Sequence, residues 1–208
     1  MMFHGVNQIR FVVNLSGLLV MLVLITSCVQ APSKPPLPAD QSAVSKGIEI
    51  LQDNEIEDKS TALLAFKTAC DLGNNYGCHQ IGMAYVNGLY GAEKNTILAR
   101  KWFLDAANRG YFPSQQNLAN LHALKLVDPA NDVEGYKWII LASNGARVCT
   151  PKTAGTEGFV NRQDAKRVCQ LALQGQSRIR SILRNRLTAQ GRQKADSLAN
   201  SWLQKHSH

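Results

Sequence analysis

The five cysteines are the residues of this chain with the widest range of chemistry. A cysteine can bind a metal ion, form a disulfide, act as a nucleophile or carry a covalent group. Thiolate zinc sites favour paired short spacings, which this sequence lacks. Cys78 and His79 are also adjacent, so their side chains would point in different directions on one helix. A metal site built from Cys70, Cys78, His79 and His122 is therefore not predicted, and no cofactor is expected.

The sequence contains no established catalytic motif. It lacks H-E-x-x-H, G-x-S-x-G, a phosphate-binding loop and the dinucleotide-binding glycine fingerprint. Its acidic residues are scattered, and no pair of them is placed for acid–base chemistry. We therefore expect a protein that is not an enzyme.

The net charge of +8 is concentrated in the C-terminal quarter of the chain. Residues 161–208 contain ten lysines and arginines but only Asp164 and Asp196 as acidic residues. A solvated helix surface is the simpler interpretation of this pattern. The alternative is docking to an anionic lipid, envelope polymer or protein, with Arg180 and Arg184 as contacts. Nucleic acid is not an expected partner, because no aromatic residues alternate with these arginines.

A repeated pattern of helix pairs organises residues 60–146. Gly73, Gly110 and Gly145 follow one another at spacings of 37 and 35 residues. When the three copies are aligned on these glycines, an aromatic residue occupies the same position in each copy, and a small residue follows it four positions later. A period of this size, with small and aromatic residues at fixed offsets, is typical of stacked helical hairpins. The aromatic set is Phe66, Phe103 and Trp138, and the small set is Cys70, Ala107 and Ala142.

The middle copy resembles the Sel-one-like repeat, a relative of the tetratricopeptide repeat. The matching patterns are G-x-x-x-G-C-x-x-x-G-x-x-Y-x-x-G at Gly73–Gly88 and A-R-K-W-F-x-x-A-A-x-x-G at Ala99–Gly110. The resemblance covers about residues 42–146. It implies an all-α fold, a right-handed α-solenoid of stacked antiparallel helix pairs with a C-terminal helical cap. Helices over 162–173, 178–186 and 188–205 are expected to form that cap.

The spacing of Cys70 and Cys78 also resembles the cysteine-rich, secreted branch of this repeat family. In that branch such a pair bridges one hairpin, and antiparallel helices place the two positions face to face. Cys149 and Cys169 then remain to pair with each other. Some members of the branch are associated with penicillin binding and β-lactamase activity, which makes a hydrolase the alternative function. KTAG at Lys152–Gly155 is only distantly similar to the K-T-G motif of those enzymes.

The N-terminus resembles a bacterial lipoprotein signal. An apolar stretch ends in LITSC, which is similar to the lipobox, and implies cleavage before Cys28 and acylation of that residue. Val29 follows the cysteine in place of the aspartate that retains lipoproteins at the inner membrane. The expected location is therefore the outer membrane, facing the periplasm. One lipidated cysteine and two disulfides would account for all five cysteines.

These observations predict four segments. Residues 1–27 are a signal peptide, 28–40 a proline-rich tether, 41–146 the repeats, and 147–208 a disulfide-pinned loop followed by the basic helical cap. The resemblance implies a non-catalytic scaffold that binds a protein or peptide partner. Exposed positions on the first helix of each repeat are the candidate contacts. They are His79, Tyr85, Asn117 and His122, to which the basic cap adds Arg180 and Arg184.

Overall fold

The computed structural model describes residues 37–53, 59–147 and 162–206, and the side chains of 162–168 and 171 are outside its description. The predicted signal peptide, Cys28, Cys149 and the KTAG motif therefore lie outside the described residues. Among the described residues, no helix combines the length and the apolar content needed to cross a bilayer.

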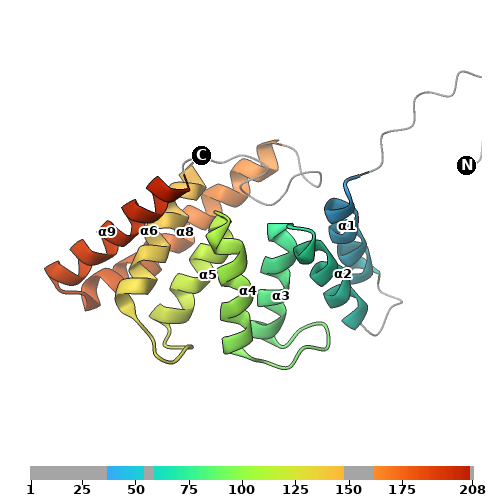
Figure 1. The fold of residues 1–208 in the computed structure, drawn as a ribbon, viewed down its shortest axis with the longest axis horizontal. Coiled ribbons are helices and arrows are strands. Elements are labelled where there is room, and N and C mark those ends of the chain that lie inside the picture. The colour runs from blue at the N-terminus through green and yellow to red at the C-terminus, as the bar shows by residue number, and fades with distance from the viewer. Residues whose placement is uncertain (1–36, 54–58, 148–161, 207–208) are drawn as a thin grey trace, which may run out of the picture. The chain divides into compact units, whose positions relative to one another are not determined.

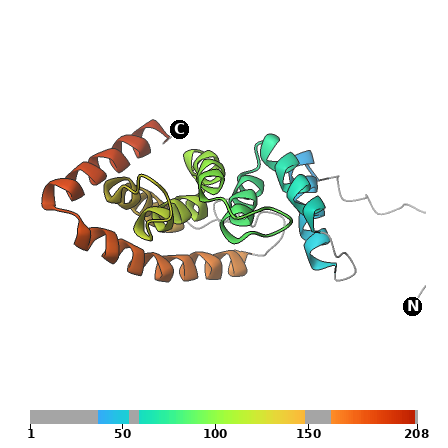
Figure 2. The same ribbon diagram turned by 90° about the horizontal axis from the view of Figure 1, so that it is seen from below.

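The described residues form eight helices, and each of the first six packs against the next one along the chain (Figure 1). This arrangement confirms the predicted all-α fold of sequentially stacked helix pairs. Two further helices pack on α6, which lies between them in Figure 2. The helices are α1 Ala39–Gln52, α2 Ser60–Asp71, α3 Asn75–Asn87, α4 Thr96–Asn108, α5 Phe112–Ala123, α6 Asp132–Arg147, α8 Arg162–Arg186 and α9 Ala189–Lys205.

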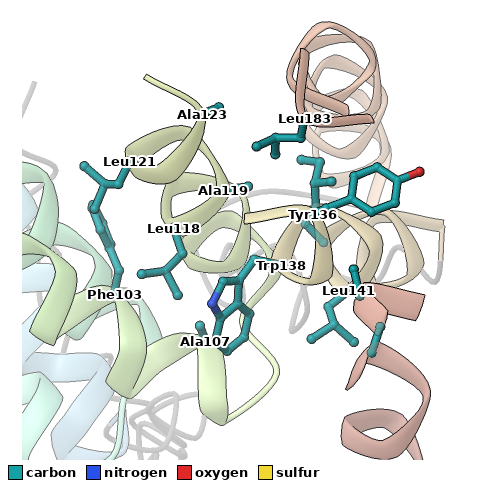
Figure 3. Packing of buried hydrophobic residues seen from close by; sticks show 14 of the residues in the cluster. Phe103, Ala107, Leu118, Ala119, Leu121, Ala123, Tyr136, Trp138, Leu141 and Leu183 are labelled. Carbon is teal, nitrogen blue, oxygen red and sulfur yellow. The ribbon is translucent and has the colours of Figure 1, made fainter. Parts of the chain in front are cut away.

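The aromatic register of the repeat forms the core. Phe66 and Phe103 are 0% exposed and Trp138 is 2% exposed, on α2, α4 and α6 respectively. Figure 3 shows the larger core cluster, in which Phe103, Leu118 and Trp138 belong to one continuous set of buried side chains. The predicted repeat therefore corresponds to equivalent buried positions on alternate helices.

Glycines allow neighbouring helices to approach closely at two points of the repeat. A Cβ atom on Gly77 would lie 2.7 Å from the Phe66 carbonyl oxygen and 2.9 Å from the Cys70 amide nitrogen. A Cβ atom on Gly82 would lie 2.5 Å from the Phe103 ring. These positions hold α3 against α2 on one side and against α4 on the other, and a larger residue would force the helices apart.

Side-chain caps determine where several helices begin. The Asn74 side chain accepts hydrogen bonds from the Tyr76 and Gly77 amides at the start of α3. Asn95 caps α4 and Thr188 caps α9 in the same manner. At α2, Lys59 occupies the cap position without a side-chain hydrogen bond.

Two features of the C-terminal half differ from the pattern in the sequence. Gly145 shares the spacing of Gly73 and Gly110 but lies inside α6, and a Cβ there would be 2.7 Å from Phe112 Cβ, so this glycine provides space instead of a turn. In the two earlier copies, Gly73 and Gly110 do follow their helices, with φ of +91° and +87°. The helices expected over 162–173 and 178–186 are a single helix, α8, which continues through Gly175.

Replacing Gly77 by alanine should destabilise the fold by about 1–3 kcal/mol, because the added methyl group meets backbone atoms of α2. The matched control is Gly175→Ala on α8, where the nearest atom to the new Cβ is 3.5 Å away. That variant should be neutral or more stable by up to about 1 kcal/mol through helix propensity. Denaturant midpoints would measure both changes, and equal effects at the two sites would contradict the close-packing argument.

Candidate functional site

His79 is half-buried and packs between α3 and α5, and its role as a partner contact stays a prediction. Its Nδ1 lies 3.0 Å from Ser114 Oγ. Its ring packs against Phe103 and Tyr111, with centroid separations of 5.5 and 5.3 Å. Burial lowers the pKa of His79 to about 4, so the imidazole is neutral at pH 7.

A serine hydroxyl beside a neutral histidine has the appearance of a nucleophile and its base. However, Ser114 is 0% exposed, and in this arrangement no substrate can reach its hydroxyl. The hydrogen bond instead joins α3 to the first turn of α5. The pair therefore supports a structural interpretation.

His122 is buried, which contradicts its prediction as an exposed contact. It is 2% exposed and its Nδ1 accepts a hydrogen bond from the Asn131 amide at 3.1 Å. Burial, with a further contribution from the positive charge of Arg100, lowers its pKa. This histidine fixes the connection between α5 and α6.

The other two predicted contacts on these helices are half-buried. Tyr85 packs against both of the larger hydrophobic clusters and so connects them. Asn117 donates a hydrogen bond from Nδ2 to Met83 Sδ at 3.2 Å, which links α5 to α3. Their role in partner binding stays a prediction.

The predicted Cys70–Cys78 disulfide is present and joins the end of α2 to the start of α3. The two Cα atoms are 4.7 Å apart. Asp105 on α4 lies beside it and forms a bidentate ion pair with Arg109, with distances of 2.8 and 3.0 Å. Sequence spacing did not indicate that α4 would bring these charged groups to the sulfur atoms.

Cys169 on α8 is disulfide-bonded and 2% exposed. Its expected partner, Cys149, lies outside the described residues. The pairing between these two cysteines therefore stays a prediction.

A polar groove of about 430 Å³ lies between α6 and α8. We call it the arginine groove, because Arg147, Arg180 and Arg184 all line it. Its wall also carries serine hydroxyls and the side chain of Asn185, with Leu173 as its apolar member. Among the described residues, the lining is Ser143, Arg147, Leu173, Gln176, Ser177, Arg180, Ser181, Arg184 and Asn185.

None of the described residues that line the arginine groove is a carboxylate, so the positive charge of its arginines is not neutralised by them. Within the described part of the chain, the ion pairs involve Arg109, Lys125, Lys137 and Arg186, and none of the groove arginines. Arg186 on α8 is paired, unlike the groove arginines. Its Nη1 lies 3.7 Å from Asp132 Oδ1 and donates a hydrogen bond to the Ala123 carbonyl oxygen. The groove arginines are therefore available for an anionic ligand.

The sequence identified only part of this site. Arg180 and Arg184 are four residues apart, so one turn of α8 places both on the same face. Arg147 ends α6, and its proximity to them follows from the packing of α6 against α8. No signal local to Arg147 could have identified it.

The fold has a solved counterpart. The chain is similar to a protective antigen of uropathogenic Escherichia coli that displays an SLR fold, with a TM-score of 0.61 and 20% sequence identity. The match covers 80% of this chain and 30% of that protein, so this chain spans about a third of its length. At this identity the likeness shows the fold alone. No protein-family model and no curated protein matches the chain.

The lowered pKa of His79 predicts a loss of stability in acid. Because the unfolded histidine titrates near 6.5 and the folded one near 4, the unfolded chain binds more protons between these values. The contribution of neutral His79 to the free energy of unfolding is complete above about pH 6.5. It falls by about 2–3 kcal/mol as the pH falls to 4. His79→Asn should make this decline smaller, although His122 would keep part of it.

Urea unfolding at a series of pH values would measure the effect. The exposed His206 serves as the control, and His206→Asn should retain the slope of the unmodified chain. An unchanged slope in His79→Asn would show that His79 is not the group responsible.

Proposed function

We propose that this SLR-fold protein is a non-catalytic scaffold that binds an acidic segment of a partner protein in the arginine groove. The observation that supports this proposal is the convergence of Arg147, Arg180 and Arg184 on one groove whose described lining residues include no carboxylate. Arginine binds carboxylates through paired N–H donors, which gives both attraction and orientation.

The spacing of the groove arginines suits an extended acidic peptide. Arg180 and Arg184 are one helical turn apart, which corresponds to a rise of about 6 Å along α8. In an extended chain, alternate residues point the same way and lie about 6.5–7 Å apart. Carboxylates at every second position would therefore lie opposite successive arginines, and Arg147 could contact a third.

We further propose that the scaffold is tethered to the bacterial cell envelope through acylated Cys28, at the outer membrane facing the periplasm. The support comes from the signal-like N-terminus and from the Cys70–Cys78 disulfide, because disulfides persist mainly in oxidising compartments. A tethered scaffold would hold its partner close to the membrane surface.

Charge reversal in the groove should abolish acidic-peptide binding. The probe is a fluorescent decapeptide of alternating glutamate and alanine, and anisotropy measures its affinity for the full mature chain. Arg180→Glu/Arg184→Glu should weaken binding by about tenfold or more, because it replaces attraction by repulsion. Binding by the unmodified chain should also weaken as salt is added.

The control has the same change in net charge outside the groove. Lys67 on α2 and Lys194 on α9 are both exposed, and Lys67→Glu/Lys194→Glu should keep most of the affinity. Equal losses of affinity in the two double variants would mean that the net charge of the protein, and not the groove, determines peptide binding. Tighter binding to anionic vesicles or to polyphosphate than to the peptide would favour a lipid or polymer partner instead.

Intact mass of the membrane-extracted protein would test the tether. We expect a chain that begins at Cys28 and carries a diacylglyceryl and an acyl group, with the other four cysteines resistant to alkylation until reduction. A mass that retains residues 1–27, or free thiols before reduction, would contradict the proposed location.

A further inference from the structure

Asp105 brings a carboxylate to the two sulfur atoms that join α2 to α3. Its Oδ2 lies 3.5 Å from Cys78 Sγ and 3.6 Å from Cys70 Sγ. The three atoms therefore lie within 4.8 Å of one another. A disulfide sulfur carries no hydrogen to donate, so in the oxidised form the carboxylate is held by its ion pair with Arg109 and not by the sulfurs.

The two sulfur–oxygen distances match those of a tetrahedral zinc site. Zinc binds thiolate sulfur at about 2.3 Å and carboxylate oxygen at about 2.0–2.2 Å, which places these ligands about 3.5–3.6 Å apart. Only the separation of the two sulfurs would have to increase, to about 3.8 Å in the same geometry. The cysteine Cα atoms are 4.7 Å apart, and in the reduced pair the sulfurs would separate by rotation about the two Cα–Cβ bonds.

We propose that the reduced form of this hairpin binds a divalent ion of the zinc class through Cys70, Cys78 and Asp105. Two thiolates and one carboxylate supply three ligands, and water completes the tetrahedron. The disulfide and the ion are alternative states of the same side chains, because a sulfur bonded to another sulfur is not a thiolate ligand.

The exchange between the two states balances chemically. A dithiol reductant transfers two electrons and two protons to the disulfide, which becomes two thiols, and the reductant becomes a disulfide. Zinc binding then displaces both thiol protons into solvent. The reverse exchange with a disulfide oxidant, which becomes a dithiol, re-forms the Cys70–Cys78 bond and releases the ion.

Charge balance and access both favour this site. Two thiolates and the Asp105 carboxylate carry three negative charges, which a divalent ion and the Arg109 guanidinium together neutralise. Arg109 is already in place, with Nη1 3.9 Å from Cys78 Sγ. The sulfurs are buried, whereas the Asp105 and Arg109 side chains are 41% and 38% exposed. An ion would therefore enter from the Asp105 side, where its bound water would face solvent.

The test uses the full mature chain, reduced with a phosphine and titrated with cobalt(II) and then with zinc. We expect one cobalt ion with sulfur-to-metal charge-transfer absorption, which zinc displaces. Zinc should also slow the alkylation of Cys70 and Cys78, measured residue by residue, and leave the rates at Cys149 and Cys169 unchanged. The oxidised chain should bind neither ion at this hairpin.

Asp105→Asn should weaken cobalt binding by about tenfold or more, since even outer-shell changes at metal sites reach that size. Asp71→Asn is the matched control, because Asp71 follows Cys70 directly but lies exposed at the end of α2 and outside the cluster. Circular dichroism of each variant would verify that it is folded.

Three results would overturn the proposal. They are equal cobalt affinity in Asp105→Asn and Asp71→Asn, charge-transfer absorption that persists in Cys70→Ser, and zinc protection of Cys149 or Cys169 in place of Cys70 and Cys78. The proposed function is independent of this outcome, because the arginine groove lies between α6 and α8 and peptide binding is measured with the disulfide intact.

Discussion

The structure depends on close approach between successive helices, at positions where one helix has no Cβ atom. Gly77 on α3 lies against the backbone of α2, and Gly82 on the same helix lies against the ring of Phe103 on α4. The pattern continues in the C-terminal half, where Gly135 faces His122 and Gly145 faces Phe112. Because each helix is held by its neighbours in the chain, the core is built by successive contacts and not around one centre.

This constraint decides which polar residues remain free to act. His79 and His122 lie where helices approach closely, so His79 is half-buried, His122 is buried, and both form hydrogen bonds within the chain. A group of arginines that form no ion pair with the described residues lies at the C-terminal end, where α8 packs on α6 and leaves the arginine groove open. The chemistry of the repeats is therefore mostly structural, and the candidate binding chemistry lies where the repeat pattern ends.

The sequence predicted the regular features of the fold well, because those features depend on local and periodic signals. Phe66, Phe103 and Trp138 are buried at equivalent positions, and Asn95 and Thr188 cap the helices expected to follow them. The failures have specific physical causes. Gly145 has the spacing of a helix end, but the close contact with Phe112 explains its presence within α6. The helices predicted over 162–173 and 178–186 are one helix, because tertiary packing keeps α8 helical through Gly175.

The sequence by itself determined the helix pairs, the Cys70–Cys78 bridge and the concentration of positive charge in residues 161–208. Each of these follows from neighbours along the chain or from a fixed period. Only the tertiary structure decided that Asp105 lies beside the disulfide sulfurs and that Arg147 joins Arg180 and Arg184. The physical reason is that a period fixes which face of a helix is buried. The contacts between groups on different helices depend on how closely and at what angle those faces meet.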